Sequence, residues 1–454
     1  MKFSLKLINV IFSVGLRVTG LSVTGLAVTG ISVTGLGAIG EVQAAPLQEV
    51  VHQETAKKLP LEELRRFSEV FDRIKNSYVE PVDDAKVLED AIRGMIAGLD
   101  PHSSYLEPEA FEELQEHTSG EFGGVGIEIS LEDGFIRVIT PIDDTPAVKA
   151  GIKAGDLITR IDNEPVKSMG LDDAINRMRG KPGTEIILTI LREGEEKPRN
   201  IKVIRDVIKV TSIKHRMLGD QYAYIRITQF QGNTGSDLKQ VLHKIQSQGE
   251  IKGLVLDMRN NPGGVLQAAV EVVDAFINKG MIVYTKGRLS SADTEFLATD
   301  DIVLADVPMA VLINGGSASA SEIVAGALQD HKRAVIMGTA SFGKGSVQTI
   351  LPLTDQRALK LTTARYFTPS GRSIQAQGIQ PDVVVEEAEL KKLQVRAFPK
   401  EKDLSGHLFN GQVDESEDAQ LEDAGKGLAE RDYQLYEALN LLKAVAIVGK
   451  VTSS

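Results

Sequence analysis

A turn of small residues that runs into an apolar helix is the feature that most constrains this chain. Residues 314–321 read NGGSASAS, and the apolar segment that follows has the character of a helix. Small side chains let a second backbone approach closely, and a helix N-terminus directs backbone N–H groups at a developing negative charge. This pattern indicates an α/β unit with a reactive site at the start of a helix.

A lysine and a glutamine follow about two dozen residues later. Lys344 and Gln348 are four residues apart, which puts both on one face of either a strand or a helical turn. A serine hydroxyl becomes a nucleophile only when a base takes its proton, and lysine can be that base when burial or neighbouring charge lowers its pKa. The combination predicts a Ser/Lys hydrolase, with Ser317, Ser319 and Ser321 all open as the nucleophile. The plainer interpretation is an N-cap serine and a solvated surface lysine.

Charge and composition argue against several classes of function. The 454 residues have a formal net charge of −12, which argues against nucleic acid as a partner. The chain has no cysteine, so disulfides, thiolate chemistry and cysteine zinc sites are excluded. The seven histidines are scattered without an HExxH-like pair, and we expect neither a metal nor another cofactor.

The first 44 residues are predicted to be a signal peptide. Lys2 and Lys6 precede a long apolar stretch, and small residues up to Ala44 fit a cleavage site before Ala45 and Pro46. Four VTG repeats between positions 18 and 37 lengthen this stretch. We expect an exported, periplasmic protein, with an uncleaved inner-membrane anchor as the alternative because the stretch is long enough to span a bilayer.

The rest of the sequence divides into four parts. Residues 45–117 form an N-terminal helical region, with two amphipathic helices between 60 and 99. Residues 118–206 carry short strands at 125–129, 135–139, 156–161 and 186–192, with helical pieces at 146–150 and 171–178. Residues 207–385 alternate strands at 223–227, 253–257, 282–285, 309–313 and 334–337 with helices near 236–245, 265–276 and 321–329, and then carry strands at 346–351 and 358–363. Residues 386–454 are predicted to be an acidic linker and a last amphipathic helix at 432–448.

A glycine-rich segment opens the second of these parts. Gly124, Val125, Gly126 and Ile127 could form only a tight turn into a hairpin, or could present N–H groups to a carboxylate beside a strand edge. Together with residues 145–152 and 154–158, this segment resembles a bacterial PDZ domain. The resemblance implies that the four residues bind the carboxylate of a polypeptide C-terminus, whose apolar last side chain enters a pocket near Val125 and Ile127.

Several ordered motifs point to one family. They are the strand and glycine turn at 253–264, the serine turn at 314–323, and the segments 342–348, 366–375 and 378–382. With the PDZ-like segment, they resemble the carboxyl-terminal processing proteases, PDZ-containing periplasmic Ser/Lys peptidases of the tail-specific type. The resemblance runs from about residue 62 to 385, with an echo at 432–442. It implies a multidomain α/β protein: a crotonase/ClpP-like α/β spiral core with an inserted PDZ domain and helical segments at both ends.

The resemblance also implies the roles of single residues. Ser319 is the implied nucleophile, Lys344 the general base and Gln348 the residue that orients this base. The implied oxyanion donors are the N–H groups of Ala320 and of the Gly263–Gly264 turn, with the choice between the two glycines open. The implied partners are protein or peptide C-termini as substrates, an activating adaptor protein and further copies of this chain.

Three alternatives remain open at this point. The first is a catalytically silent PDZ scaffold of the cell envelope, against which the presence of Ser319, Lys344 and Gln348 argues. The second is acyl-CoA chemistry, since the core is akin to the crotonase fold, although an export signal does not suit a cytoplasmic substrate. The third is a Ser/His/Asp triad that uses His331, which we interpret instead as part of a solvated helix end.

Overall fold

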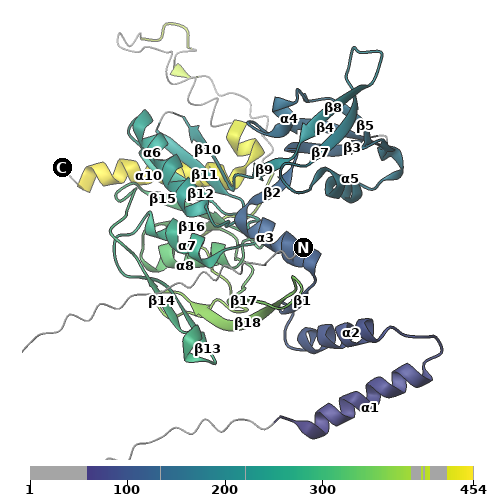
Figure 1. Cartoon of the computed structure of the whole chain (residues 1–454). Coiled ribbons are helices and arrows are strands. Elements are labelled where there is room, and N and C mark those ends of the chain that lie inside the picture. Colours follow the sequence, from purple (N-terminus) through teal and green to yellow (C-terminus); the bar gives the residue numbers. More distant parts are fainter. Residues whose placement is uncertain are drawn as a thin grey trace, which may run out of the picture. The chain divides into compact units, whose positions relative to one another are not determined.

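The computed structural model describes residues 59–132, 134–219, 221–389, 400–401, 404–408 and 427–452 (Figure 1). Residues 1–72 and 73–454 cluster into two separate units. The predicted signal peptide with its VTG repeats and most of the predicted acidic linker lie outside the described residues. Within the part that is described, no helix is both long and apolar enough to cross a membrane.

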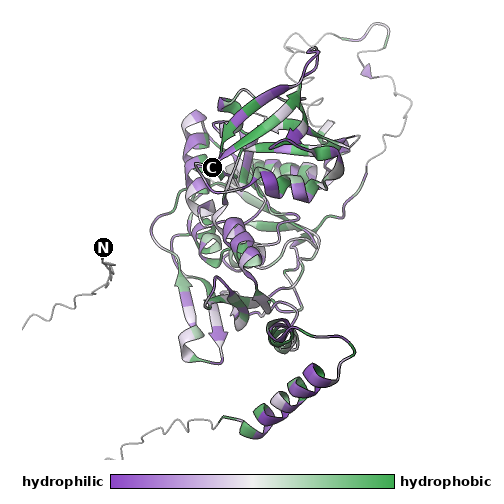
Figure 2. Cartoon of the chain, turned by 45° about the vertical axis from the view of Figure 1, so that its right-hand side comes forward, coloured by the Kyte–Doolittle hydropathy of each residue, from purple (hydrophilic) through white to green (hydrophobic). Residues whose placement is uncertain are grey.

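The two predicted N-terminal helices are confirmed as α1 (Leu61–Ser77) and α2 (Asp84–Ala97). Hydrophobic and hydrophilic residues alternate along α1 (Figure 2), and none of its residues is buried. Asp83 begins α2 by accepting a hydrogen bond from the backbone N–H of Lys86. A third helix, α3 (Pro108–Ser119), was not predicted, and it ends at Gly120 in the left-handed conformation. The predicted boundary at 117/118 therefore falls inside a helix.

The next domain is a small sheet that a two-stranded ribbon connects to the rest of the chain. Its strand order is β3-β4-β5-β7-β8, with β6 beside β5. The ribbon pairs β2 (Glu121–Gly124) with β9 (Asp206–Lys209), so the predicted boundary at 206/207 lies within β9. The remaining elements are β3 (Ile127–Glu132), β4 (Phe135–Pro141), α4 (Pro146–Lys149), β5 (Leu157–Ile161), β6 (Glu164–Pro165), α5 (Leu171–Met178), β7 (Glu185–Leu191) and β8 (Arg199–Ile204).

A six-stranded sheet forms the centre of the largest domain. Its order is β10-β11-β12-β15-β16-β19, antiparallel between the first two strands and parallel afterwards. Short apolar runs predicted the central strands, which suits parallel strands buried on both faces. The strands are β10 (Ile213–Leu218), β11 (Tyr222–Ile227), β12 (Gly253–Asp257), β15 (Met309–Ile313), β16 (Val335–Gly338) and β19 (Val383–Val384).

Helices cover both faces of this sheet, because alternate strand residues point to opposite sides. On one face, Ile225, Leu256 and Val311 pack in one core with α6 (Thr234–Gln248), α7 (Leu266–Asp274) and α8 (Ala320–Asp330). On the other face, a second core joins neighbouring strand residues to the C-terminal helix α10 (Tyr433–Thr452) through Leu435, Ala438 and Leu442. The C-terminal helix is therefore part of the folded core of this domain.

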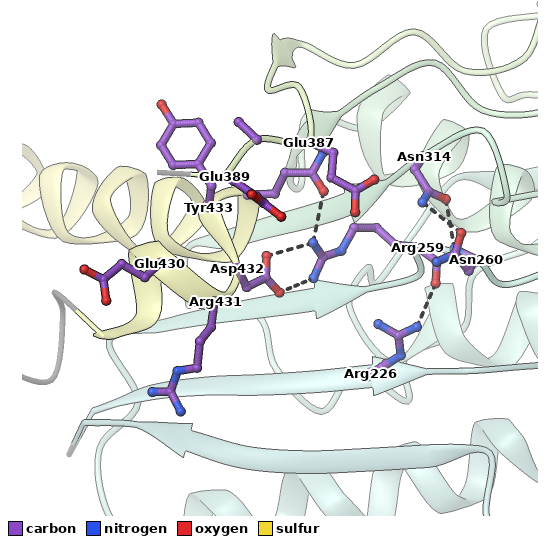
Figure 3. A pocket seen from close by; sticks show the side chains of 12 residues that line it. Arg226, Arg259, Asn260, Asn314, Glu387, Glu389, Glu430, Arg431, Asp432 and Tyr433 are labelled. Carbon is purple, nitrogen blue, oxygen red and sulfur yellow. Dashed lines mark hydrogen bonds and ion pairs between the residues drawn. The ribbon is translucent and has the colours of Figure 1, made fainter. Parts of the chain in front are cut away.

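An arginine joins the start of α10 to the end of β12 (Figure 3). The Arg259 guanidinium donates to Asp432 at 2.7 and 2.9 Å, to the buried Asp257 at 2.7 and 3.0 Å, and to Gln434 at 3.0 Å. Asp432 also accepts from the backbone N–H of Leu435 and so caps the helix. This contact ties the C-terminal segment to the turn that follows β12.

A second sheet in the same domain has the order β1-β18-β13-β14, with β17 also paired to β18. Its strands are β1 (Ser104–Leu106), β13 (Met281–Gly287), β14 (Thr294–Leu297), β17 (Ser346–Pro352) and β18 (Ala358–Phe367). The predicted strands at 346–351 and 358–363 form the β17–β18 hairpin. Lys344 comes just before this hairpin, and Gln348 lies on its first strand.

Candidate active site

Ser319 stands where the chain passes from β15 into α8. It is the N-cap of the helix, and its backbone angles are φ 58° and ψ −113°. A side chain in this region of φ is strained, and such strain persists only where the surroundings hold it. Here the Ser319 N–H donates to the carboxylate of Glu322 at 2.7 Å. The predicted serine turn at a helix mouth is therefore present in the fold.

The surroundings distinguish the three serines that the sequence left open. Ser317 is fully buried, and its hydroxyl donates to the carbonyl oxygen of Met258 at 2.8 Å. Ser321 is fully buried too, and its hydroxyl donates to the carbonyl oxygen of Asn261 at 2.9 Å. Ser319 is half-buried and lines a cavity of about 640 Å³. Of the three, only Ser319 combines access to this cavity with a hydroxyl that is not committed to a backbone carbonyl.

The same cavity brings together all of the predicted catalytic and oxyanion residues. Lys344, Gln348 and Ala320 line it beside Ser319, together with Gly263, Gly264, Lys360 and Tyr366. These residues come from the end of β12, the start of α8 and the β17–β18 hairpin, which are far apart in the sequence. Burial in this cavity partly desolvates the amine of Lys344.

The environment of Lys344 lowers the pKa of its amino group. Burial is the main cause, and the positive charge of Lys360 acts in the same direction. The negative charges of Glu322 and Asp100 oppose this shift without cancelling it. At a given pH, a larger fraction of Lys344 is neutral than of an ordinary lysine. The alternative of a solvated surface lysine does not fit this environment.

Glu322 links the serine turn to the lysine loop, and sequence analysis missed it. Its buried carboxylate accepts from the N–H groups of Ser319, Gly343 and Lys344 at 2.7, 2.7 and 2.9 Å, and from the Ser341 hydroxyl at 2.6 Å. Burial raises the pKa of Glu322, and these donated hydrogen bonds act against the rise. The S-x-x-E spacing of Ser319 and Glu322 was a capping-box signal that could have revealed this role.

Tyr366 is a second residue that the sequence did not single out. Its hydroxyl donates to the carbonyl oxygen of Lys344. Burial raises the pKa of this phenol well above its ordinary value, and a hydrogen bond that the phenol oxygen accepts from the Ser319 side chain acts against the rise. The phenol therefore stays protonated, and it braces the backbone of Lys344 beside the serine.

The amide of Gln348 has defined partners on the hairpin. Its Nε2 donates to the hydroxyl of Ser346 at 3.0 Å and to that of Thr362, on the neighbouring strand, at 3.2 Å. A register shift between Val347 and Gln348 interrupts the simple alternation of β17. The four-residue spacing alone could not have given this placement.

The two glycines after β12 differ in their hydrogen bonds. The N–H of Gly263 donates to Oδ1 of Asn261 at 2.9 Å, whereas the N–H of Gly264 and that of Ala320 have no acceptor among the described residues. Gly263 has φ 100°, and a Cβ at this position would lie 2.7 Å from Cβ of Ser319. Glycine is needed at 263 because the turn passes directly behind the serine.

The structure places His331 away from this site. It is the C-cap of α8, at the opposite end from Ser319, and its Nε2 lies 2.7 Å from the carbonyl oxygen of Met281. A helix of 11 residues is roughly 16 Å long, so the two side chains cannot act together. The Ser/His/Asp alternative is wrong for this pair. The described residues contain no group of three or more His, Asp or Glu side chains placed to hold a metal ion.

The predicted peptide-binding segment lines a separate cavity of about 430 Å³. Gly124, Val125, Gly126 and Ile127 border it, and its apolar walls come from Phe122, Ile129, Ile139, Ile175 and Met178. The strand expected at 125–129 begins only at Ile127, because Gly126 has φ 79° and breaks the strand. The N–H groups of Val125 and Gly126 have no acceptor among the described residues. Free donors beside an apolar cavity suit an apolar chain end that carries a carboxylate.

Comparison with known proteins identifies both domains that carry these cavities. The family model described as Peptidase family S41 matches residues 221–385, and the PDZ domain model matches residues 123–203. A "Carboxy-terminal-processing protease" of Bartonella bacilliformis is 49% identical over 392 residues, which are 84% of this chain and 88% of the relative. The chain belongs to the carboxy-terminal-processing proteases of peptidase family S41. This confirms the predicted family and enzyme class, and it excludes the acyl-CoA alternative.

This S41 peptidase also matches a model of an N-terminal domain, a second curated relative and a solved structure. The model "Activating protease CtpB N-terminal domain" matches residues 27–110, and so begins inside the predicted signal peptide. A "Probable CtpA-like serine protease" of Staphylococcus epidermidis is 37% identical over 338 residues, which are 73% of this chain and 67% of the relative. The solved photosystem II D1 C-terminal processing protease is 31% identical with a TM-score of 0.42, over 71% of this chain and 93% of that one. The chain is thus a multidomain α/β protein with a CtpB-like N-terminal domain, a PDZ domain and an S41 peptidase domain.

Proposed function

We propose that this S41 peptidase is an exported endopeptidase that captures the C-terminal tails of proteins with its PDZ domain and cleaves them with a Ser319/Lys344 dyad. The observation that carries the proposal is the shared cavity of Ser319 and Lys344, in a site where the pKa of the lysine is lowered. Ser317 and Ser321 are buried with their protons committed elsewhere.

In the proposed reaction, the neutral amine of Lys344 takes the proton of the Ser319 hydroxyl while this oxygen attacks the scissile carbonyl. The resulting lysine ammonium then gives a proton to the leaving amine. Water, activated by the same amine, hydrolyses the acyl-enzyme and frees Ser319. Gln348 would orient the lysine amine throughout.

The oxyanion would bind to backbone N–H groups at the mouth of α8. We infer that Gly264 and Ala320 are the donors, since neither N–H group has an acceptor within the described part of the chain, whereas the Gly263 N–H donates to Asn261. The N-terminal end of α8 adds its positive dipole at this point. The role of Gly263 would be to let the turn pass close to Ser319.

The PDZ domain would select the substrate. The N–H groups of Val125 and Gly126 would receive the terminal carboxylate, and the apolar cavity would take the last side chain. The edge of the strand that begins at Ile127 would pair with the peptide backbone. A tail bound in this way would deliver the preceding segment of the substrate to Ser319.

Export, assembly and the finer fold type also belong to this proposal. The basic residues and apolar stretch before Ala44 support export, with cleavage there or retention as an anchor. The family resemblance supports a homo-oligomer and an activating adaptor protein. The largely parallel sheet with helices α6, α7 and α8 on one face supports a crotonase/ClpP-like spiral core.

Product analysis by mass spectrometry tests the peptidase assignment. Candidate envelope proteins are incubated with the wild-type protein and with Ser319→Ala, which should be folded and inactive because the site already contains small residues. Ser317→Ala and Ser321→Ala serve as controls for the choice of serine. An active Ser319→Ala variant would overturn the proposal, and wild-type products equal to those of a no-enzyme control would favour the silent-scaffold alternative.

Fluorescence anisotropy on the Ser319→Ala protein tests the tail-binding role. The probes are free-acid, amidated and Asp-terminated versions of one substrate tail. Amidation should weaken binding by about 1.5–3 kcal/mol, the usual contribution of a hydrogen bond to a charged group. An Asp terminus should weaken it too, because it puts a charge into an apolar cavity. Equal affinity for all three peptides would mean that residues 123–203 do not read C-termini.

A further inference from the structure

A hydrogen-bonded chain runs from the predicted lysine partner, Gln348, to a carboxylate on a distant loop. Gln348 on β17 lies directly opposite Thr362 on β18. The Thr362 hydroxyl lies 3.1 Å from Oδ1 of Asp100, in the turn between α2 and β1. None of the roles proposed above includes Asp100 or Thr362.

The two hydroxyls beside Gln348 do not by themselves decide how its amide is turned. The amide presents an NH₂ group at one end and a carbonyl oxygen at the other, and a hydroxyl can face either end because it both donates and accepts. The Gln348 amide is within hydrogen-bond distance of the Ser346 and Thr362 hydroxyls. Its orientation therefore depends on where these hydroxyls send their own protons.

Asp100 determines which group donates and which accepts in each of these hydrogen bonds. An ionised carboxylate only accepts hydrogen bonds, so the single proton of the Thr362 hydroxyl goes to Asp100. The Thr362 oxygen must then accept from Gln348, which places the NH₂ end toward Thr362. The carbonyl oxygen of Gln348 is left as the end that can accept a hydrogen bond from an amine.

The carboxylate of Asp100 is itself held firmly. It accepts from the N–H groups of His102 and Ser103 at 2.8 and 3.0 Å, and from the buried Ser103 hydroxyl at 2.7 Å. The Ser103 oxygen in turn accepts from the N–H of Thr362 at 3.1 Å. Burial would raise the pKa of Asp100, but hydrogen bonds from Ser103, His102 and Thr362 outweigh it and hold the pKa below the ordinary value. Asp100 is therefore ionised and remains an acceptor.

We propose that Asp100, acting through Thr362, is a positioning residue that fixes the Gln348 amide with its carbonyl oxygen available to the amino group of Lys344. This inference rests on the proposed Ser319/Lys344 dyad. An amine that donates one N–H to a fixed carbonyl oxygen has its lone pair held in one direction, which is what abstraction of the Ser319 proton requires.

Thr362→Val is the main test, because valine keeps the shape of threonine and removes the hydroxyl. We expect kcat on a fluorogenic tail peptide to fall on the order of tenfold to a hundredfold, with KM unchanged, as for a misplaced catalytic group. Thr362→Ser restores the hydroxyl and should restore most of kcat. Asp100→Asn should lower kcat in the same way. The new amide can donate to the Thr362 hydroxyl, which would then donate to Gln348 and turn its amide around.

The matched control is Thr363→Val on the same strand. Adjacent strand residues point to opposite faces, and the Thr363 hydroxyl pairs with that of Thr349 at 2.6 Å instead of with Gln348. Thr363→Val should leave kcat near that of the wild type. In a Gln348→Ala background, Thr362→Val should have little further effect, because the amide that Thr362 orients is already absent.

Three outcomes would overturn the positioning role. They are a wild-type kcat in Thr362→Val, an equal loss in Thr363→Val, and a full additional loss from Thr362→Val in the Gln348→Ala background. Ser319→Ala is run beside these variants. If it stays active, the proposed dyad fails; if it is inactive while Thr362→Val is fully active, only the role of Asp100 and Thr362 fails.

Discussion

At the scale of single residues, the proposed mechanism depends on the fraction of Lys344 that is neutral. Burial and the charge of Lys360 lower the pKa of Lys344, while Glu322 and Asp100 act in the opposite direction. A general base must be deprotonated, so activity is expected to rise with pH through the lowered pKa.

The first prediction concerns the base itself. Lys344→Arg should be as inactive as Lys344→Ala, although it keeps the positive charge, because a guanidinium stays protonated at every working pH. Turnover of a fluorogenic peptide measures this, with circular dichroism spectra as the control for folding. Substantial turnover by the arginine variant would disprove the role of Lys344 as the base.

The second prediction concerns Lys360, which lines the same cavity. Lys360→Gln removes a positive charge that lowers the pKa of Lys344. The pKa of Lys344 should then rise, so less amine is neutral at a given pH and the ascending limb of kcat moves to higher pH. Lys360→Arg keeps the charge and should leave the limb in place. An unmoved limb in the glutamine variant would contradict the electrostatic argument.

At the scale of elements, the C-terminal helix α10 covers one face of the central sheet. Leu435, Ala438 and Leu442 pack against strand residues of β11, β12, β15 and β16, and Arg259 ties the start of the helix to the turn after β12. A sheet face without this helix would expose several apolar side chains to water. The helix is therefore expected to contribute to the stability of the peptidase domain.

The element-scale prediction is a loss of stability when the packing of α10 is reduced. Leu435 is fully buried, so Leu435→Ala should lower the free energy of unfolding by about 2–5 kcal/mol. Ile447 lies on the same helix and is 68% exposed, so Ile447→Ala should have an effect near zero. Urea unfolding of both variants in the Ser319→Ala background, which avoids self-digestion, provides the comparison. Equal midpoints for the two would show that α10 does not stabilise the domain.

At the scale of the whole molecule, the PDZ domain is an insertion whose two ends meet. Gly124 and Asp206 are cross-strand partners in the β2–β9 ribbon, so the chain enters and leaves the domain at one place. The domain also has its own hydrophobic core, separate from those of the peptidase sheet. Residues 125–205 should therefore be removable without breaking the rest of the fold.

The whole-molecule prediction replaces residues 125–205 by an Asn-Gly hairpin loop, which suits a two-residue connection between paired strands. The shortened protein should fold and still cleave an unstructured fluorogenic peptide, since Ser319, Lys344 and Gln348 all lie outside the deletion. It should no longer distinguish free-acid from amidated tails. Full discrimination by the shortened protein would mean that the tail is read elsewhere.

Local pattern determined a large part of this protein. The apolar runs of the parallel strands, the serine turn at the mouth of α8 and the two helices between 60 and 99 were all predicted, because periodicity and turn chemistry act over a few neighbouring residues. The motifs also predicted the family and the enzyme class. Helix α3 was missed, since it is polar along most of its length and has no buried residue.

Only the tertiary structure decided which of the predicted site residues lie close together. It buries Ser317 and Ser321 and leaves Ser319 at the cavity. Asn261 accepts a hydrogen bond from the N–H of Gly263 and not from that of Gly264. The tertiary structure also brought Asp100 to Thr362, 262 residues away, a contact that no local sequence pattern predicts. The physical reason is that burial and hydrogen-bond partners depend on residues far apart in the sequence, whereas helices, strands and turns depend on near ones.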